Sequence, residues 1–442
     1  MTEKNYWVRA STYVTLQRLA IFVFGFGSYF FMVRYFSKDT FGVWTLFVVI
    51  TSIVEMSRSA FIQNAFVKFY SQPNIDRFSL TTASITLNFI STLVFIALML
   101  GLIPVLTIFW HTKEIMGLIL WYCSTSLILV PLTQLNYLEQ ANQSFRGVFW
   151  SAVVRQGLFF SVVVICFLWV PNLSLNFFAA MQSVGAIAGL ITAWILSKQF
   201  APRRLATDRA MVRSLFKFGK YILGTGVAST IGKNADQILL GSISHSSVAL
   251  YNAAVRVMNF VEIPTLSISN IVYPKIAERA NLEGKEAAGR LYEKSVATIV
   301  GIILPVIVGL LVLPEIVLLI TAGKSYLEAA PILRIMATAA ILIPFNVQVG
   351  SAFEVIGKPH VSFYINISAN VVNLVVNILL IPRLGIMGAV WAMLITNVFI
   401  FVVSQVLLRR EMGISLLRTG VQLIEFYTTA PGHIRGFISR KK

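Results

Sequence analysis

Charged residues are scarce in this sequence of 442 residues. Only 12% of them are Asp, Glu, Lys or Arg, whereas 57% are hydrophobic, and the mean hydropathy is +0.78. A soluble protein of this length needs more charge to cover its surface. The composition therefore excludes a soluble domain and predicts an integral membrane protein.

Acidic residues, cysteines and histidines are also few. The chain has 18 acidic against 36 basic residues, but the basic ones lie at the ends of apolar segments and not on one soluble face, which argues against nucleic-acid binding. The two cysteines, Cys123 and Cys166, fall in apolar segments and predict free buried thiols. The four histidines lack the spacing of a metal site, and no catalytic motif is present. We therefore expect neither an enzyme nor a cofactor.

Long apolar runs dominate the sequence. About 20 apolar residues are needed to cross a bilayer core of roughly 30 Å. Twelve segments meet this length and predict an all-α polytopic membrane protein: 12–35, 43–66, 80–106, 115–138, 147–170, 174–197, 215–240, 249–272, 295–320, 330–353, 361–382 and 386–408.

The basic, polar run 198–214 separates the twelve predicted spans into two sets of six. We therefore expect an N-terminal six-helix bundle at 1–197, a cytoplasmic linker at 198–214, a C-terminal six-helix bundle at 215–408 and a basic tail at 409–442. Most extramembrane Lys and Arg fall on one side of this topology, which places both termini in the cytoplasm. The tail is mildly amphipathic and predicts an interfacial helix on anionic membrane lipids, followed by a frayed end.

A hairpin in the middle of the chain repeats one near its start. With an offset of 207 positions, Phe41-Gly42-Val43-Trp44 aligns with Val248-Ala249-Leu250-Tyr251, and Glu55 aligns with Glu262. Each half begins inside and holds an even number of spans, so the two halves run in the same orientation. This pattern indicates a parallel repeat with a site between its copies.

Two pairs of opposite charges lie within the predicted spans. A charge at mid-bilayer costs roughly 2.5–3.5 kcal/mol on the insertion scale, so such residues usually face a partner or a wet cavity. Glu55 and Arg58 are spaced i,i+3, as are Lys233 and Asp236. Each pair could neutralise itself on one helix face or take part in transport.

Other intramembrane charges have no partner on their own helix. Arg18, Arg256 and Glu262 lack an opposite charge at i±3 or i±4, which favours a functional role for them. Arg155 and Arg334 are left as candidates for ion pairs with acids on other helices.

Two glutamates mark the inner end of the fourth helix in each half. An offset of 215 positions aligns Glu139 with Glu354. At these ends we expect a structural lock to a neighbouring loop rather than contact with a substrate.

Two stretches of the chain resemble oligosaccharide flippases of the polysaccharide-exporter family. Residues 236–278, from DQILLGSIS to IVYPKIAE, are similar to their seventh-to-eighth helix region, and residues 354–396 are similar to their tenth to twelfth helices. The pieces Gly357-Lys358-Pro359 and 381–389 (IPRLGIMGA) are the most specific. The family shares a superfamily with multidrug and toxin extrusion antiporters and lipid II flippases. The resemblance implies two six-helix bundles forming a V, with helices 1, 2, 7 and 8 facing a central cleft.

The resemblance also implies a substrate. It is a polyprenyl-pyrophosphate-linked oligosaccharide, moved from the inner to the outer leaflet of the cytoplasmic membrane for O-antigen, lipopolysaccharide or exopolysaccharide synthesis. A polysaccharide polymerase and a chain-length regulator are the implied protein partners. The alternative is an ion-coupled multidrug or toxin antiporter of the same fold, but that branch exports mainly cationic drugs through acidic sites. A polysaccharide polymerase itself would require a large outer loop, which this sequence lacks.

The pyrophosphate of such a cargo requires cationic ligands. Arginine binds phosphate oxygens through its planar fork. We predict Arg18, Arg58, Arg256 and Lys233 as substrate-binding residues that form a two-level ladder along the cleft. The first three match, by helix, the arginines that lipid II flippases carry on helices 1, 2 and 8.

Alternating access of an anionic cargo also requires an ion that favours one state. Glu262 has no basic partner on its helix, so desolvation should favour its protonated form. We predict coupling to H⁺ or Na⁺ at Glu262, with Asp236 as a possible relay and Glu55 as the equivalent acid of the first half. The opposing interpretation is that Glu262 forms a salt bridge across the cleft.

Overall fold

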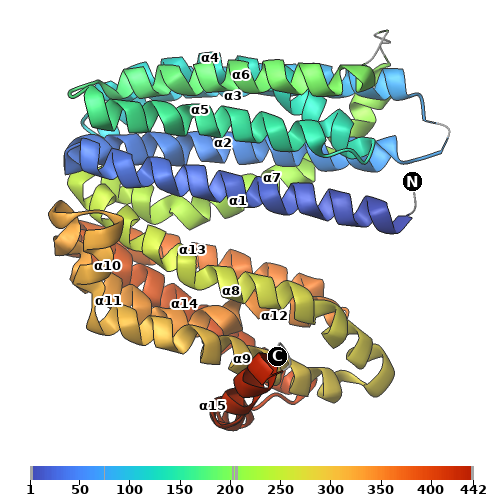
Figure 1. The fold of residues 1–442 in the computed structure, drawn as a ribbon, viewed down its shortest axis with the longest axis vertical. Coiled ribbons are helices and arrows are strands. Elements are labelled where there is room, and N and C mark those ends of the chain that lie inside the picture. The colour runs from blue at the N-terminus through green and yellow to red at the C-terminus, as the bar shows by residue number, and fades with distance from the viewer. Residues whose placement is uncertain (1–2, 74, 202–203, 205–207, 440–442) are drawn as a thin grey trace. The chain divides into compact units, whose positions relative to one another are not determined.

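The computed structural model describes residues 3–73, 75–201, 204 and 208–439, and every regular element in this part of the chain is helical (Figure 1). In chain order the elements are α1 (Glu3–Tyr35), α2 (Lys38–Tyr70), α3 (Arg77–Phe109), α4 (Glu114–Ala141), α5 (Arg146–Trp169), α6 (Leu175–Ser197), η1 (Lys198–Phe200), α7 (Arg209–Gly241), α8 (His245–Glu283), α9 (Lys285–Val312), α10 (Pro314–Thr321), η2 (Lys324–Ala329), α11 (Ala330–Ala339), η3 (Ala340–Leu342), α12 (Ile343–Val355), α13 (Pro359–Leu384), α14 (Ile386–Met412) and α15 (Leu416–Ser439).

Ten helical stretches of the described residues are long and apolar enough to cross a membrane. Each overlaps one of the predicted spans other than 215–240 and 249–272. Those two spans correspond to α7 and α8, which have 33 and 39 residues and are therefore long enough, but are less apolar. The all-helical membrane fold is confirmed, whereas the count of twelve spans stays a prediction.

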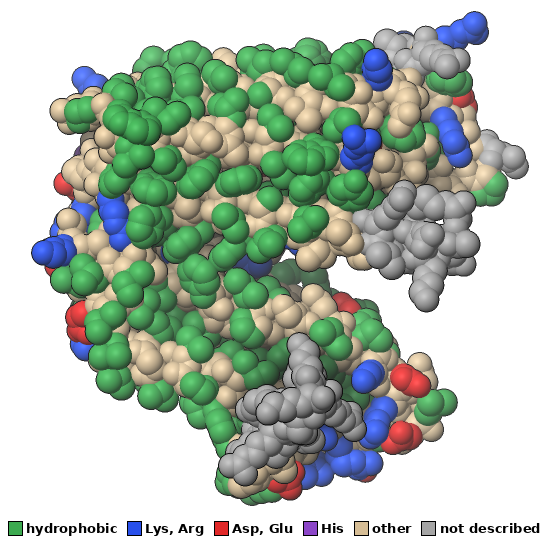
Figure 2. Space-filling view, in the orientation of Figure 1, with side chains coloured by type: hydrophobic (Ala, Val, Ile, Leu, Met, Phe, Trp, Pro, Cys, Tyr) green, Lys and Arg blue, Asp and Glu red, His purple; other side chains and the backbone are tan. Residues whose placement is uncertain are grey.

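Apolar side chains cover much of the outer surface of the helices. Ile108, Trp169 and Val312 are 74%, 71% and 63% exposed. On the face shown in Figure 2, hydrophobic side chains extend along the helices, and most charged side chains lie near the helix ends. Soluble monomers rarely expose apolar patches of this extent. This distribution is the one that a lipid bilayer requires.

Contacts divide the chain into two compact units. The N-terminal unit contains Met1–Asn234 and Gly241–Ala249, and the C-terminal unit contains Ala235–Leu240 and Leu250–Lys442. In the N-terminal unit α1 packs on α5, α4 and α5 pack on α6, and α2 and α3 pack on α4. In the C-terminal unit α13 packs on α14, α11 packs on α9 and α14, and α15 packs on α9. The boundary thus falls within α7 and α8.

The predicted bundle boundaries at 197 and 215 stay predictions. Part of the predicted linker (202–203 and 205–207) and the end of the predicted tail (440–442) lie outside the described residues.

Short polar side chains begin several helices. The Ser37 hydroxyl accepts a hydrogen bond from the Thr40 backbone N–H at the start of α2. At the start of α3, Asp76 accepts bonds from the Ser79 hydroxyl (2.6 Å) and the Phe78 N–H (3.0 Å). These two bonds lower the pKa of Asp76 below its ordinary value of 3.8. Such caps satisfy N–H groups that have no partner within the helix.

Glycines let helices of the N-terminal unit approach closely. A Cβ on Gly42 of α2 would overlap the backbone of His245, and a Cβ on Gly219 of α7 would overlap the carbonyl oxygen of Phe61. The His245 ring nitrogen Nε2 also lies 2.7 Å from the Trp110 carbonyl oxygen. Small residues of this kind permit close backbone packing between membrane helices. The first turn of α8 is thereby anchored to the N-terminal unit.

The predicted span 295–320 is wrong as one continuous helix. α9 ends at Val312, and a separate eight-residue helix, α10, begins at Pro314. The cause is Pro314, which has no N–H for a bond to the preceding turn but is well suited to the first position of a new helix.

The tail forms helix α15, as predicted, and it is docked at its start. The buried carboxylate of Glu293 accepts a hydrogen bond from the Ser415 N–H (2.5 Å) and forms an ion pair with Arg418 (3.0 Å). Farther along, the Tyr427 hydroxyl donates to the Gly301 carbonyl oxygen at 2.6 Å. Three apolar side chains at helical spacing remain largely exposed: Leu417, Val421 and Ile424. This face has the character of an interfacial helix.

Candidate functional site

A charged cluster lies inside the N-terminal unit. Nη2 of Arg58 donates to Oε2 of Glu55 at 2.9 Å, and the Tyr122 hydroxyl donates to Oε1 of the same carboxylate at 2.8 Å. The Arg58 side chain is only 2% exposed, whereas that of Glu55 is 32% exposed. Both carboxylate oxygens are therefore engaged. We call Glu55, Arg58 and Tyr122 the Glu55 cluster.

Neighbouring polar groups hold this cluster in place. Nη1 of Arg58 lies 3.4 Å from Oδ1 of Asn88, and Asn88 in turn donates to the Thr133 hydroxyl at 3.1 Å. Asn88 is fully buried. The i,i+3 ion pair between Glu55 and Arg58 therefore exists, and Arg58 is enclosed by its partners. A substrate could reach Arg58 only by displacing these bonds.

Asp236 is buried in the last two turns of α7, before the short loop that leads to α8. Its Oδ2 accepts a hydrogen bond from the Tyr251 hydroxyl, and its Oδ1 accepts one from the Gln237 N–H at 2.9 Å. The Asn252 amide donates to Gln237 Oε1 at 3.1 Å, so the helix ends are joined twice. Lys233, by contrast, is exposed. Asp236 is therefore satisfied by a tyrosine and a backbone amide.

A polar stripe runs along α8. Asn252, Arg256, Asn259 and Glu262 follow one another at spacings of three or four residues and so share one helix face. Arg256 and Glu262 are partly buried. Tyr251, the partner of Asp236, lies about 16 Å from Glu262 along the helix axis at 1.5 Å per residue. A proton path between the two acids would need intermediate groups.

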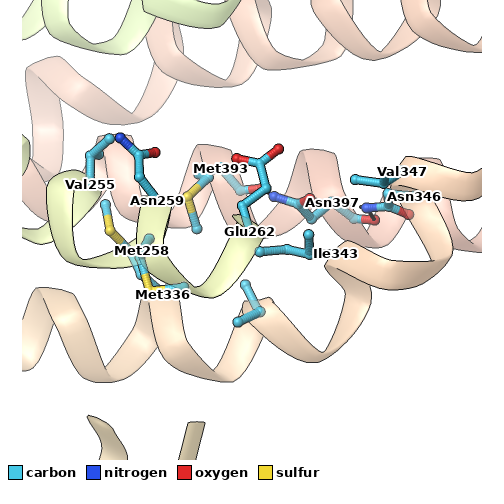
Figure 3. A pocket seen from close by; sticks show the side chains of 12 residues that line it. Val255, Met258, Asn259, Glu262, Met336, Ile343, Asn346, Val347, Met393 and Asn397 are labelled. Carbon is cyan, nitrogen blue, oxygen red and sulfur yellow. Dashed lines mark hydrogen bonds between the residues drawn. The ribbon is translucent and has the colours of Figure 1, made fainter. Parts of the chain in front are cut away.

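Glu262 lines a pocket inside the C-terminal unit (Figure 3). The pocket has a volume of about 260 Å³ and lies among α8, α11, α12 and α14. Its lining residues are Val255, Met258, Asn259, Glu262, Met336, Ala339, Ala340, Ile343, Asn346, Val347, Met393 and Asn397. We call it the Glu262 pocket.

Two asparagines supply the pocket with oxygen atoms. Nδ2 of Asn346 donates to Oδ1 of Asn397 at 3.0 Å, and Nδ2 of Asn397 donates to the Met393 carbonyl oxygen at 3.0 Å. Oδ1 of Asn346 is buried and receives no hydrogen bond from the described residues. Figure 3 shows the methionines on one side of Glu262 and this asparagine pair on the other.

The chemistry of the Glu262 pocket favours a small cation or a proton. A carboxylate and an unsatisfied amide oxygen are hard acceptors, which suit H⁺ and hard cations. Among the described residues, no group of three or more His, Cys, Asp or Glu side chains could hold a metal ion. The predicted coupling role of Glu262 stays a prediction.

The other predicted ligands are spread over both units. Arg18 on α1 and Lys233 on α7 are exposed and belong to the N-terminal unit, whereas Arg256 belongs to the C-terminal unit. The two-level cationic ladder stays a prediction.

Glu139 and Arg334 form bonds of the kind predicted for them. Oε2 of Glu139 accepts a hydrogen bond from the Val148 N–H at 3.0 Å and so locks α4 to the first turn of α5. Its repeat equivalent, Glu354, is exposed. Arg334 forms an ion pair with Glu315 on α10 at 2.7 Å. The predicted free thiols, Cys123 and Cys166, are both buried and unpaired.

Sequence reasoning missed several polar partners. These partners are uncharged, so a search for charged residues alone does not find them. They are Tyr122, Asn88, Tyr251, Asn346 and Asn397. A signal was available, because an asparagine inside an apolar span is costly unless it finds a partner.

The sequence is similar to a known family. The model of the family described as "Polysaccharide biosynthesis protein" matches residues 31–331. Among curated relatives, the "Probable low-salt glycan biosynthesis flippase Agl15" of Haloferax volcanii is 23% identical over 206 residues, which is 46% of this chain and 43% of that protein. The "Teichuronic acid biosynthesis protein TuaB" of Bacillus subtilis is 24% identical over 289 residues, which is 62% of this chain and 58% of that protein. The chain spans about half the length of these relatives.

Two solved structures share the fold over nearly the whole chain. The lipid II flippase MurJ, in an inward closed conformation, matches with a TM-score of 0.74 at 14% identity and covers 94% of this chain and 90% of that one. An inward-facing multidrug resistance transporter of the MATE family, in the MOP superfamily, matches with a TM-score of 0.73 at 14% identity, over 91% of this chain and 98% of that one. The expected multidrug and toxin extrusion-like fold is confirmed.

Proposed function

The chain belongs to the polysaccharide biosynthesis protein family, and we propose that it is a flippase for lipid-linked oligosaccharides. Its cargo is a polyprenyl-pyrophosphate-linked oligosaccharide, which crosses from the inner to the outer leaflet of the cytoplasmic membrane by alternating access. The product supplies the synthesis of cell-surface polysaccharide. The observation that carries the proposal is the family match over residues 31–331. The roles named for the Haloferax and Bacillus relatives support it.

The chemistry of the cargo is compatible with the charges of the chain. A pyrophosphate is strongly anionic and needs cations along its path through the membrane. Arg18 and Lys233 are exposed and therefore accessible to an anionic group, and Arg256 is partly buried on the polar stripe of α8. We propose these three as substrate ligands. Arg58, enclosed by Glu55 and Asn88, keeps the Glu55 cluster neutral.

A multidrug antiporter is the second candidate. The observation that favours it is the fold shared with the MATE transporter at a TM-score of 0.73. Export of cationic drugs requires acidic residues in the transport path, whereas the sequence of this chain has twice as many basic as acidic residues. The lipid-linked oligosaccharide is therefore the better supported cargo.

A reconstituted flipping assay tests the proposal. A fluorescent polyprenyl-pyrophosphate disaccharide is the probe, and it is incorporated into liposomes that contain the purified protein. A membrane-impermeant quencher reports how much of the probe crosses the bilayer. We expect rapid crossing with wild-type protein, strong losses with Arg18→Ala and Lys233→Ala, and no loss with the control Arg383→Ala, which removes an exposed cation at the end of α13. Export of a cationic dye without any movement of the lipid probe would overturn the flippase and support the antiporter.

Coupling to H⁺ or Na⁺ at the Glu262 pocket is part of the proposal. Glu262 supplies the exchangeable carboxylate, and Asn346 supplies an unsatisfied oxygen to the same pocket. The same liposome assay, run under imposed pH or sodium gradients, measures crossing of the lipid probe for wild type, for Glu262→Gln and for the exposed control Glu354→Gln. We expect only Glu262→Gln to abolish the gradient dependence. If it retains that dependence in full, Glu262 is not the coupling residue.

We also propose that both termini face the cytoplasm and that α15 rests on anionic lipid. The bias of basic residues supports this orientation, and the exposed apolar side chains of α15 support its position at the membrane surface. A reporter fused after Lys442 should be active only on the cytoplasmic side, and periplasmic activity would contradict the topology. A polymerase and a chain-length regulator are the proposed protein partners in the same membrane.

A further inference from the structure

Arg155 of the N-terminal unit lies near the Glu55 cluster without being bonded to it. Arg155 lies on α5 and is partly buried, yet it makes no hydrogen bond or ion pair with any residue in the part of the chain that the structure describes. It still interacts electrostatically with both Glu55 and Arg58. It is therefore close to the Glu55 cluster but not bonded within it.

The charges around Arg155 do not cancel. Glu55 and Arg58 form an ion pair at 2.9 Å, and the second oxygen of Glu55 is taken by Tyr122. With this pair closed, Arg155 leaves one uncompensated positive charge among the three groups. A charge within a membrane helix is retained chiefly when it faces a partner or a water-filled path.

The base of the Arg155 side chain is tightly enclosed. A Cβ on Gly185 of α6 would lie 2.9 Å from the Arg155 carbonyl oxygen, and a Cβ on Gly189 would lie 3.1 Å from the Arg155 Cβ. Two glycines, one turn apart, thus bring α6 directly against α5 at this level. The stem is fixed by backbone packing, which lowers the entropy that the guanidinium loses when it binds a ligand.

We propose that Arg155 is a binding residue for the pyrophosphate of the lipid-linked cargo, an inference that rests on the proposed flippase function. Its guanidinium fork matches two phosphate oxygens, as that of Arg58 would, but only Arg155 is free to do so. The Glu55–Arg58 pair acts as a neutral support beside it. Arg155 thus takes the place that we predicted for Arg58 as the arginine of this region that contacts substrate.

Direct binding measurements test this role. The probe is polyprenyl pyrophosphate, titrated into the purified full-length protein in detergent, with phosphatidylglycerol as a competitor that carries a single phosphodiester. A charge-assisted hydrogen-bonded contact of this kind corresponds to about a ten- to hundredfold change in affinity. We expect this loss with Arg155→Ala and Arg155→Gln and a smaller loss with Arg155→Lys, which keeps the charge without the fork. The control Arg34→Ala removes a partly buried arginine of the same unit that is bonded to the Phe30 carbonyl oxygen, and it should not weaken binding.

Thermal unfolding of the same variants separates ligand binding from a structural role. If Arg155 binds the cargo, affinity falls while the melting temperature of the ligand-free protein stays near that of wild type. If Arg155 only stabilises Glu55, the alanine and glutamine variants melt earlier and bind normally after correction for folded protein, which overturns the proposal. The proposal is also overturned if phosphatidylglycerol displaces the bound probe as effectively as an excess of polyprenyl pyrophosphate does. The site would then bind any membrane phosphate.

The outcome for wild type distinguishes the two proposals. Absence of polyprenyl pyrophosphate binding to wild type would reject the flippase function together with the role of Arg155. Unchanged binding in Arg155→Ala, with normal binding in wild type, would reject only the role of Arg155.

Discussion

Replacing Glu55 by glutamine is expected to destabilise the protein more than replacing its partner Arg58. Glu55→Gln leaves the guanidinium of Arg58, which is 2% exposed, without a counter-charge. Removal of one member of a buried ion pair typically costs about 3–5 kcal/mol because the other charge is left uncompensated. Arg58 has little access to water, so the cost of Glu55→Gln should lie in this range.

The reverse change leaves a different residue behind. After Arg58→Met, Glu55 is still about one-third exposed and still accepts the Tyr122 hydrogen bond. Its carboxylate can also become neutral by taking up a proton. An arginine has no such option, because it does not lose its proton at accessible pH. We therefore expect Arg58→Met to cost only about 1–3 kcal/mol, which is the cost of an unsatisfied polar group.

A double-mutant cycle measures the difference. Reversible unfolding of the purified protein in mixed micelles gives the free energy of unfolding for wild type, both single variants and the double variant, with the exposed Glu354→Gln as a control. The double variant should be less destabilised than the sum of the single variants, with a coupling of about 0.5–3 kcal/mol. Additive effects, or a larger loss for Arg58→Met than for Glu55→Gln, would refute the assignment of Arg58 as the more deeply buried member.

Three further changes test other parts of the structure. Gly42→Val should greatly reduce the yield of folded protein in size-exclusion chromatography, because its side chain would overlap the His245 backbone, whereas Gly101→Ala, with open space around it, should behave like wild type. Glu293→Gln should loosen α15 by weakening its bonds to Ser415 and Arg418, so limited proteolysis should remove the tail faster, and equal rates would contradict this docking. Asp76 has a lowered pKa, so its contribution to the stability of α3 is present at neutral pH and is lost as the pH falls below its ordinary value of 3.8. Asp76→Asn should reduce this acid sensitivity in hydrogen exchange at the start of α3, and an unchanged pH profile would show that the cap does not contribute.

The class of protein and most of its helices can be predicted from the amino-acid sequence alone. Scarce charge and apolar runs of spanning length leave no other solution than membrane helices, because backbone polar groups in lipid must be satisfied within the segment. The internal repeat was also readable. The offset that aligns Glu55 with Glu262 aligns Lys38 with His245, and these two residues begin α2 and α8. The break at Pro314 was also open to prediction, but the hydrophobicity on both sides of it concealed it.

The partners of the intramembrane polar groups, by contrast, depend on how the helices pack in the folded protein. Helices that are apolar on all sides carry no periodic signal for their buried face, so sequence spacing cannot assign partners between helices. Glu55 and Arg58 are neighbours on one helix, and their pairing was one of two predicted outcomes. The bond of Asp236 to Tyr251, the asparagine pair beside Glu262 and the unbonded Arg155 depend on how separate helices are rotated and packed. Side-chain packing sets these rotations, and the hydrophobic pattern that places a helix in the membrane leaves them undetermined.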